Sequence, residues 1–222
     1  MPKVMKLPRR RQRSGRFWRS RQGSRSMIEL VHNPVVPAVL QAYVAANRAA
    51  VPADFDSAAF QPVKRQVKAS LNADQGGLCV YCETELAAQS GQVDHIKPKS
   101  GPNAHPHLAF TYSNYAQSCI NEKTCGQKKK AGLLPIQPGP GCNDDFSLST
   151  DGQLEPMPDL IRQRKHAVRQ TRDMLGLQNA ALVRERQRWI ETVIELMQNQ
   201  PALVPAFLAD KPFRHILRRL AA

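Results

Sequence analysis

The chain has 222 residues and a formal net charge of +14, with 32 Lys and Arg residues against 18 Asp and Glu residues. This length suffices for one domain with additions, and the absence of an apolar run that could span a bilayer predicts a soluble protein. Ten of the basic residues lie within residues 1–26, which contain no Asp or Glu, so the remaining 22 nearly balance the acidic residues. The overall charge is therefore weak evidence for a nucleic-acid partner, and local clusters decide that question.

Residues 1–26 carry this basic excess and lack the apolar stretch of a secretory signal. Their composition cannot bury enough apolar surface to fold, so we expect a disordered and dispensable extension. Met27 is then a natural start for the folded chain. Without an export signal, we expect a cytoplasmic protein with reduced thiols.

Residues 27–75 are predicted to form an N-terminal helical segment. Apolar residues recur at helical spacing after Pro37, and the same spacing returns in the series that begins at Phe60. Ser57 suits the N-cap of the second helix, and Gly76 with Gly77 ends it.

Residues 76–135 predict a small mixed core. The pattern indicates a tight turn over 78–84, a short strand over 92–96, a second strand over 112–117 and a helix that begins near Cys125. Two short strands and one short helix bury little apolar surface, so this core needs further support.

After the core, residues 136–156 are predicted to form a loop and a hairpin, and Asp151-Gly152 would form the turn of the hairpin. Helical periodicity then returns in residues 157–222, which we expect to form a C-terminal helical segment. The expected fold class is α+β, with a small core embedded between N-terminal and C-terminal helical segments.

Four of the five cysteines form two pairs, Cys79 with Cys82 and Cys119 with Cys125. A Cys-x2-Cys turn points two thiolates at one metal ion, and a second pair completes a tetrahedral zinc site. The gap of five residues in the second pair is wider than usual, but its ends can still meet. We therefore predict that these four cysteines hold a structural zinc that supports the small core, and that Cys142 is a free thiol.

Asp94 and His95 lie between the two cysteine pairs, on the first predicted strand. Consecutive strand residues point to opposite faces, so the two side chains have different tasks. A carboxylate facing a divalent cation and an imidazole facing a water molecule would together hydrolyse a phosphodiester bond. His suits the role of the base because its ordinary pKa lies near neutrality.

These motifs resemble those of the HNH, or ββα-metal, endonucleases. The resemblance implies that Asp94 binds a catalytic metal ion and that His95 is the general base. It also implies that Asn114 steadies the loop that carries the base. The cysteines would then be the zinc clamp found in many members, within a zinc-stapled ββα-metal (HNH) core.

One position departs from that family, because Gly126 stands directly after the last cysteine of the clamp, where Asn or His often completes the catalytic metal site. Asn121, in the widened loop, is one candidate substitute, since its oxygen suits Mg²⁺ or Mn²⁺. Alternatively, Asp94 holds the ion with water and substrate phosphate, or activity is low or lost.

Four lysines near these motifs are candidates for nucleic-acid binding. Lys97 and Lys99 follow the proposed base, and Lys128 and Lys129 begin the helix after the clamp. Their charges would hold phosphates on both sides of a scissile bond without reading sequence.

A narrower resemblance covers residues 27–200, on segments such as Gly77–Glu83, Asp94–Ser100 and Leu175–Leu182. It points to the PtuB family, the HNH-nuclease subunits of Septu and of some retron anti-phage systems, which act beside an ABC-type ATPase, PtuA. We therefore expect an endonuclease that hydrolyses DNA in such a defence system. The alternatives are a non-catalytic zinc-knuckle protein that binds nucleic acid, and a stand-alone restriction-type or toxin nuclease.

Overall fold

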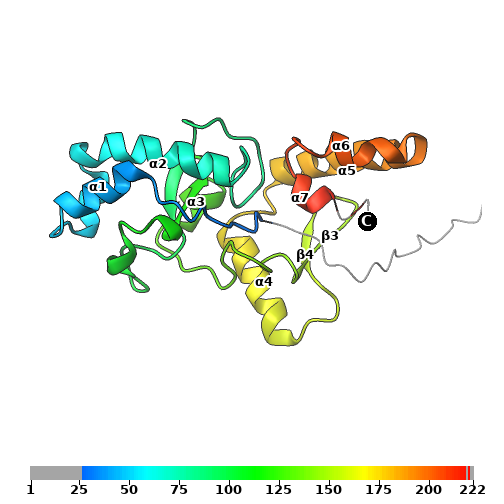
Figure 1. Cartoon of the computed structure of the whole chain (residues 1–222). Helices are drawn as coiled ribbons and strands as arrows, with labels where there is room; N and C mark the ends of the chain where they lie inside the picture. The colour runs from blue at the N-terminus through cyan, green and yellow to red at the C-terminus, as the bar shows by residue number, and fades with distance from the viewer. Residues whose placement is uncertain (1–26, 219, 221–222) are drawn as a thin grey trace, which may run out of the picture.

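The computed structural model describes residues 27–218 and 220, so the expected extension over residues 1–26 lies outside the described part of the chain. Short strands lie near the middle of the molecule, with helices α1 and α2 on one side and α5, α6 and α7 on the other (Figure 1). Among the described residues, no helix is both long enough and apolar enough to cross a membrane.

The two helices predicted before the cysteines are confirmed as α1 (Ala38–Ala46) and α2 (Gln61–Asp74). Short 3-10 turns lead from one to the other over Pro52–Asp56 and Ala58–Phe60. Helix α2 buries Val63, Val67 and Leu71, which recur at helical spacing, and it packs against both central strands.

The central strands are β1 (Gln92–His95) and β2 (Tyr115–Ser118), and they pair antiparallel with Asp94 opposite Ala116 and His95 opposite Tyr115. The second strand begins later than predicted because Tyr112–Asn114 forms a 3-10 turn, in which the Asn114 amide donates to the Thr111 carbonyl. The predicted helix near Cys125 is confirmed as α3 (Cys125–Lys129).

The predicted hairpin is confirmed as β3 (Phe146–Leu148) and β4 (Leu154–Pro156), which pair antiparallel. Two long helices follow, α4 (Arg162–Met174) and α5 (Ala180–Asn199). The chain then forms a 3-10 turn over Pro201–Leu203 and the short helices α6 (Val204–Phe207) and α7 (Arg214–Leu217).

The hairpin of β1 and β2 lies between two clusters of buried apolar side chains. One cluster gathers α1, α2 and the ring of Tyr115, while the larger one gathers the cysteines, Ala116 and residues of α4, α5 and α7. Because side chains alternate across a strand, Tyr115 and Ala116 face different clusters. The structure is thus α+β, with the hairpin between helical regions. The segment boundaries predicted from sequence stay predictions.

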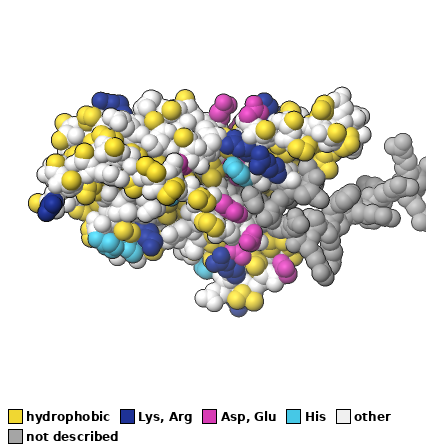
Figure 2. All heavy atoms as spheres, in the orientation of Figure 1, with side chains coloured by type: hydrophobic (Ala, Val, Ile, Leu, Met, Phe, Trp, Pro, Cys, Tyr) yellow, Lys and Arg dark blue, Asp and Glu magenta, His cyan; other side chains and the backbone are white. Residues whose placement is uncertain are grey.

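The charges on one face of the molecule are dispersed. On the face shown in Figure 2, Lys and Arg side chains form small groups with Asp and Glu among them. This distribution agrees with the small excess of positive charge outside residues 1–26, so a nucleic-acid interface depends on individual placements near the site.

Candidate metal and catalytic site

The four paired cysteines converge on one point, as predicted. Their sulfur atoms all lie within 4.8 Å of one another. The Sγ atoms of Cys79 and Cys125 are 3.7 Å apart, and those of Cys82 and Cys119 are 3.9 Å apart. A tetrahedral ion with about 2.3 Å to each sulfur requires sulfur atoms about 3.8 Å apart. The donor set therefore fits a structural metal ion of the zinc type.

The backbone presets this arrangement. In the turn that carries Cys79 and Cys82, the Cys79 amide donates to the Thr84 carbonyl at 2.8 Å, and the Glu83 amide donates to the Cys79 carbonyl at 3.0 Å. Cys125 has a φ of 56°, which is unfavourable for a side chain with a Cβ, and its amide donates to the Leu175 carbonyl at 2.8 Å. This hydrogen bond to the end of α4 holds Cys125 in its strained conformation and directs its sulfur at the cluster.

The sulfur atoms are close enough to control one another's ionisation. Hydrogen bonding with Cys125 lowers the pKa of Cys119, whereas hydrogen bonding with Cys119 raises the pKa of Cys125. Neighbouring thiols can stabilise one thiolate, but four thiolates at this spacing require a cation.

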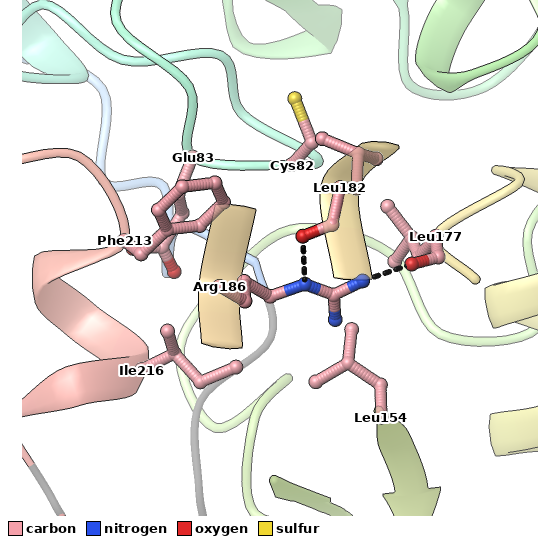
Figure 3. Close-up of a pocket in the computed structure, with 8 residues that line it drawn as sticks. All are labelled: Cys82, Glu83, Leu154, Leu177, Leu182, Arg186, Phe213 and Ile216. Atoms are coloured by element: carbon pink, nitrogen blue, oxygen red, sulfur yellow. Dashed lines mark hydrogen bonds between the residues drawn. The ribbon is translucent and has the colours of Figure 1, made fainter. Parts of the chain in front are cut away.

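A buried guanidinium lies beside this cluster. Arg186 of α5 lines a small pocket with Cys82 and Glu83, and its Nε donates to the Leu182 carbonyl at 3.2 Å (Figure 3). Burial lowers the pKa of Arg186 to about 10, and the charges of Cys82 and Glu83 act in the opposite direction. Since a guanidinium stays protonated at neutral pH, it would offset part of the negative charge of a metal bound by four thiolates.

Asp94 is only 9% exposed and lies beside Gly126, the residue that follows Cys125. Its Oδ2 accepts a hydrogen bond from the Tyr81 hydroxyl at 2.5 Å. The same oxygen forms an ion pair with the Lys129 ammonium at 3.0 Å. Lys129 also donates to the His95 carbonyl at 2.8 Å. Among the described residues, the contacts that Asp94 makes with Tyr81 and Lys129 both involve Oδ2. Oδ1 is therefore the oxygen that can hold a cation.

His95 lies on the opposite face of β1 in an aromatic surround. The rings of Phe55 and Tyr115 stand edge-on to the imidazole, with centroids 4.4 and 5.2 Å away. Nε2 lies 3.0 Å from the Ala109 carbonyl, which can only accept, so Nε2 carries the proton and Nδ1 is left as the proton acceptor. Burial lowers the pKa of His95, which keeps the ring neutral.

Asn114 closes the loop that supplies this carbonyl. Its Oδ1 accepts from the Lys97 amide at 2.8 Å, while Nδ2 donates to the carbonyls of Lys97 and Leu108 at 2.9 and 3.3 Å. The side chain therefore ties both ends of the loop between β1 and β2, next to Ala109. This placement suits the stabilising role that the resemblance implied.

No protein-family model matches the chain. A curated protein of Vibrio cholerae serotype O1 biovar El Tor, named "Retron Vc95 putative HNH endonuclease", is 45% identical to it over 204 residues, which cover 87% of this chain and 99% of the relative. The chain belongs to the HNH endonuclease family. The alignment extends well beyond the cysteines and the Asp-His pair, so the similarity concerns nearly the whole relative.

Two of the four lysines expected to contact phosphate are engaged within this HNH protein. Lys99 lies 2.9 Å from the carboxylate of Asp56, and the side chain of Lys129 is 1% exposed in its pair with Asp94. Lys128 is exposed and Lys97 is half-buried. A lysine near the end of a short helix is usually exposed to solvent, so nothing in the sequence indicated that Lys129 is buried.

Asn121 is exposed, and its Oδ1 accepts a hydrogen bond from the amide of Lys123 at 2.9 Å. The side chain thus stabilises its own turn, and its role as a ligand of the catalytic ion stays a prediction. Two contacts of the site were not predicted from the sequence: Tyr81 contacts Asp94, and Phe55 contacts His95. Tyr81 had a usable signal, because it lies between two cysteines that must converge.

Proposed function

We propose that this HNH endonuclease hydrolyses DNA phosphodiester bonds with a divalent cation, and that β1, β2 and α3 form a zinc-stapled ββα-metal core. The observation that supports the proposal is that two groups with different chemistry lie on opposite faces at the end of β1. Asp94 presents a free carboxylate oxygen on one face, and His95 presents a neutral acceptor nitrogen on the other.

In this mechanism, Nδ1 of His95 accepts a proton from the attacking water. The Ala109 carbonyl fixes the tautomer, and Asn114 holds the loop that carries this carbonyl. Asp94 would hold Mg²⁺ or Mn²⁺ through Oδ1, which would stabilise charge on the phosphate and the leaving oxygen. Tyr81 and Lys129 keep the carboxylate in place.

Substrate binding is proposed for the exposed Lys128 and the half-buried Lys97, whose charges are available to phosphates on either side of the bond. The four cysteines would hold Zn²⁺ and join the turn at Cys79 to the start of α3. Within residues 27–218, no element with a base-reading signature accompanies these residues, so we propose cleavage with little intrinsic sequence preference.

The relative's name supports a role in a retron system. We propose that this chain acts as the nuclease subunit of an anti-phage defence complex beside an ABC-type ATPase, in accord with the resemblance to the PtuB family. Co-purification of the tagged chain with the proteins encoded beside it tests this part. Recovery without an ATPase would contradict it.

The nuclease activity is tested with zinc-loaded protein and plasmid DNA in Mg²⁺ or Mn²⁺, with and without the co-purified partners. His95→Ala should lower cleavage by about a hundredfold or more while zinc content and fold are kept. His107→Ala is the matched control, because His107 is exposed outside the site. Wild-type protein that binds DNA without cleaving it under any of these conditions would favour the non-catalytic zinc-knuckle alternative.

A further inference from the structure

The space beside Gly126 is already filled by the side chains of Gln92 and Ser118. A Cβ placed on Gly126 would lie 2.6 Å from Nε2 of Gln92, 2.5 Å from Oγ of Ser118 and 3.3 Å from Cγ of Asp94. A side chain at position 126 would therefore point at Asp94, and the terminal amide of Gln92 occupies that position in this protein.

The strand geometry explains how Gln92 reaches this point. Gln92 and Asp94 are two residues apart on β1, so their side chains project from the same face. Ser118 is the partner of Gln92 in the β1–β2 register, and its hydroxyl receives a hydrogen bond from Nε2 of Gln92 at 3.4 Å. The amide is thereby held beside the Asp94 carboxylate.

We propose that Gln92 supplies the side-chain amide oxygen that completes the catalytic cation site with Asp94, in place of a side chain at position 126. This inference rests on the proposed function, because it assigns a second ligand to the cation that Asp94 would hold. An amide oxygen is a neutral hard ligand, which suits Mg²⁺ and Mn²⁺.

The hydrogen bonds around Gln92 permit the required orientation. Oε1 of Gln92 accepts from Nε2 of Gln127 at 2.6 Å, and both residues are half-buried. A half-turn of the terminal torsion exchanges oxygen and nitrogen at little cost, and the same rotation of Gln127 restores the hydrogen bond between them. Oε1 of Gln92 then lies on the side of Gly126 and Asp94.

Mn²⁺ binding to zinc-loaded, full-length protein tests this assignment without relying on cleavage. Titration followed by calorimetry or by the Mn²⁺ paramagnetic resonance signal should show one site that Asp94→Ala removes. Gln92→Ala should weaken Mn²⁺ binding at this site about tenfold or more. Gln92→Glu should preserve binding, because it keeps an oxygen ligand, and Gln89→Ala is the exposed control in the preceding loop.

A double substitution sharpens the test. Gly126→Asn should displace the Gln92 amide and the Ser118 hydroxyl and provide an oxygen of its own. Gln92→Ala should then have almost no effect on Mn²⁺ binding in the Gly126→Asn protein. Equal losses in both backgrounds would overturn the proposal.

Unchanged Mn²⁺ affinity in Gln92→Ala would also overturn it, and a loss in Asn121→Ala alone would assign the ligand to Asn121 instead. If the wild-type protein has no Mn²⁺ site that depends on Asp94, the proposed function fails with it. These outcomes are distinct from one another.

Discussion

Removing the side chain of Asn114 should weaken both the fold and catalysis, because this residue connects the two. Asn114→Ala deletes three hydrogen bonds at 2.8, 2.9 and 3.3 Å, two to the backbone of Lys97 and one to Leu108. A typical hydrogen bond contributes about 1 kcal/mol net, so the free energy of unfolding should fall by about 2–3 kcal/mol. Asn114 is 5% exposed, which limits the access of replacement water.

The effect on catalysis should come through His95. Without the loop closure, the Ala109 carbonyl no longer fixes the imidazole, and part of the general-base contribution is lost, giving at least about tenfold slower cleavage. Urea denaturation measures stability, and cleavage is measured at a temperature where both proteins are folded. Asn103→Ala, an exposed position in the same loop, is the control. Equal denaturation midpoints and equal rates for the two variants would refute the reasoning.

Three further predictions concern the metal, the buried lysine and the extension. Purified protein should contain about one zinc per chain, and a Cys79→Ser and Cys119→Ser double variant should lose both zinc and fold, as elemental analysis and circular dichroism would show. Lys129→Met should lower the free energy of unfolding by about 3–5 kcal/mol, whereas the control Lys130→Met, at an exposed position, should lower it little. Mn²⁺ should restore part of the stability lost in Lys129→Met, and equal stabilities of the two variants would contradict the prediction. A chain that begins at Met27 should keep DNA cleavage, and a plasmid assay in which it is inactive would make the basic arm functional.

The sequence was sufficient for the parts of the site that depend on spacing. Two cysteine pairs around an Asp-His dipeptide can be arranged in few ways, and in the structure the four sulfur atoms lie together as expected. Most helices and strands were also predicted, because their apolar periodicity matches one buried face. The late start of β2 was not, since the turn before it depends on Asn114, whose partners are distant in sequence.

Contacts across elements were beyond the sequence. Nothing local indicates that Lys99 pairs with Asp56, or that the ring of Phe55 packs on His95, because these partners come from the 3-10 turns before α2. Gln92 is an intermediate case. Its spacing of two residues from Asp94 places both side chains on one face of the strand. Only the closeness of Gly126 in the structure shows that Gln92 occupies the space a side chain at position 126 would take.

The turn that carries Cys79 and Cys82 also holds both ends of the described chain. The Val80 carbonyl accepts from the Ile28 amide, and Glu83 accepts from the backbone amides of Phe213 and His215. During synthesis, the turn at Cys79 can form its own hydrogen bonds early, but Cys125 gains the Leu175 carbonyl only after α4 has been made. Glu83 receives its partners later still, once Phe213 and His215 have been made. The contacts around the metal-binding turn are therefore completed in order along the chain, and a chain cut before Phe213 would lack those that Glu83 accepts.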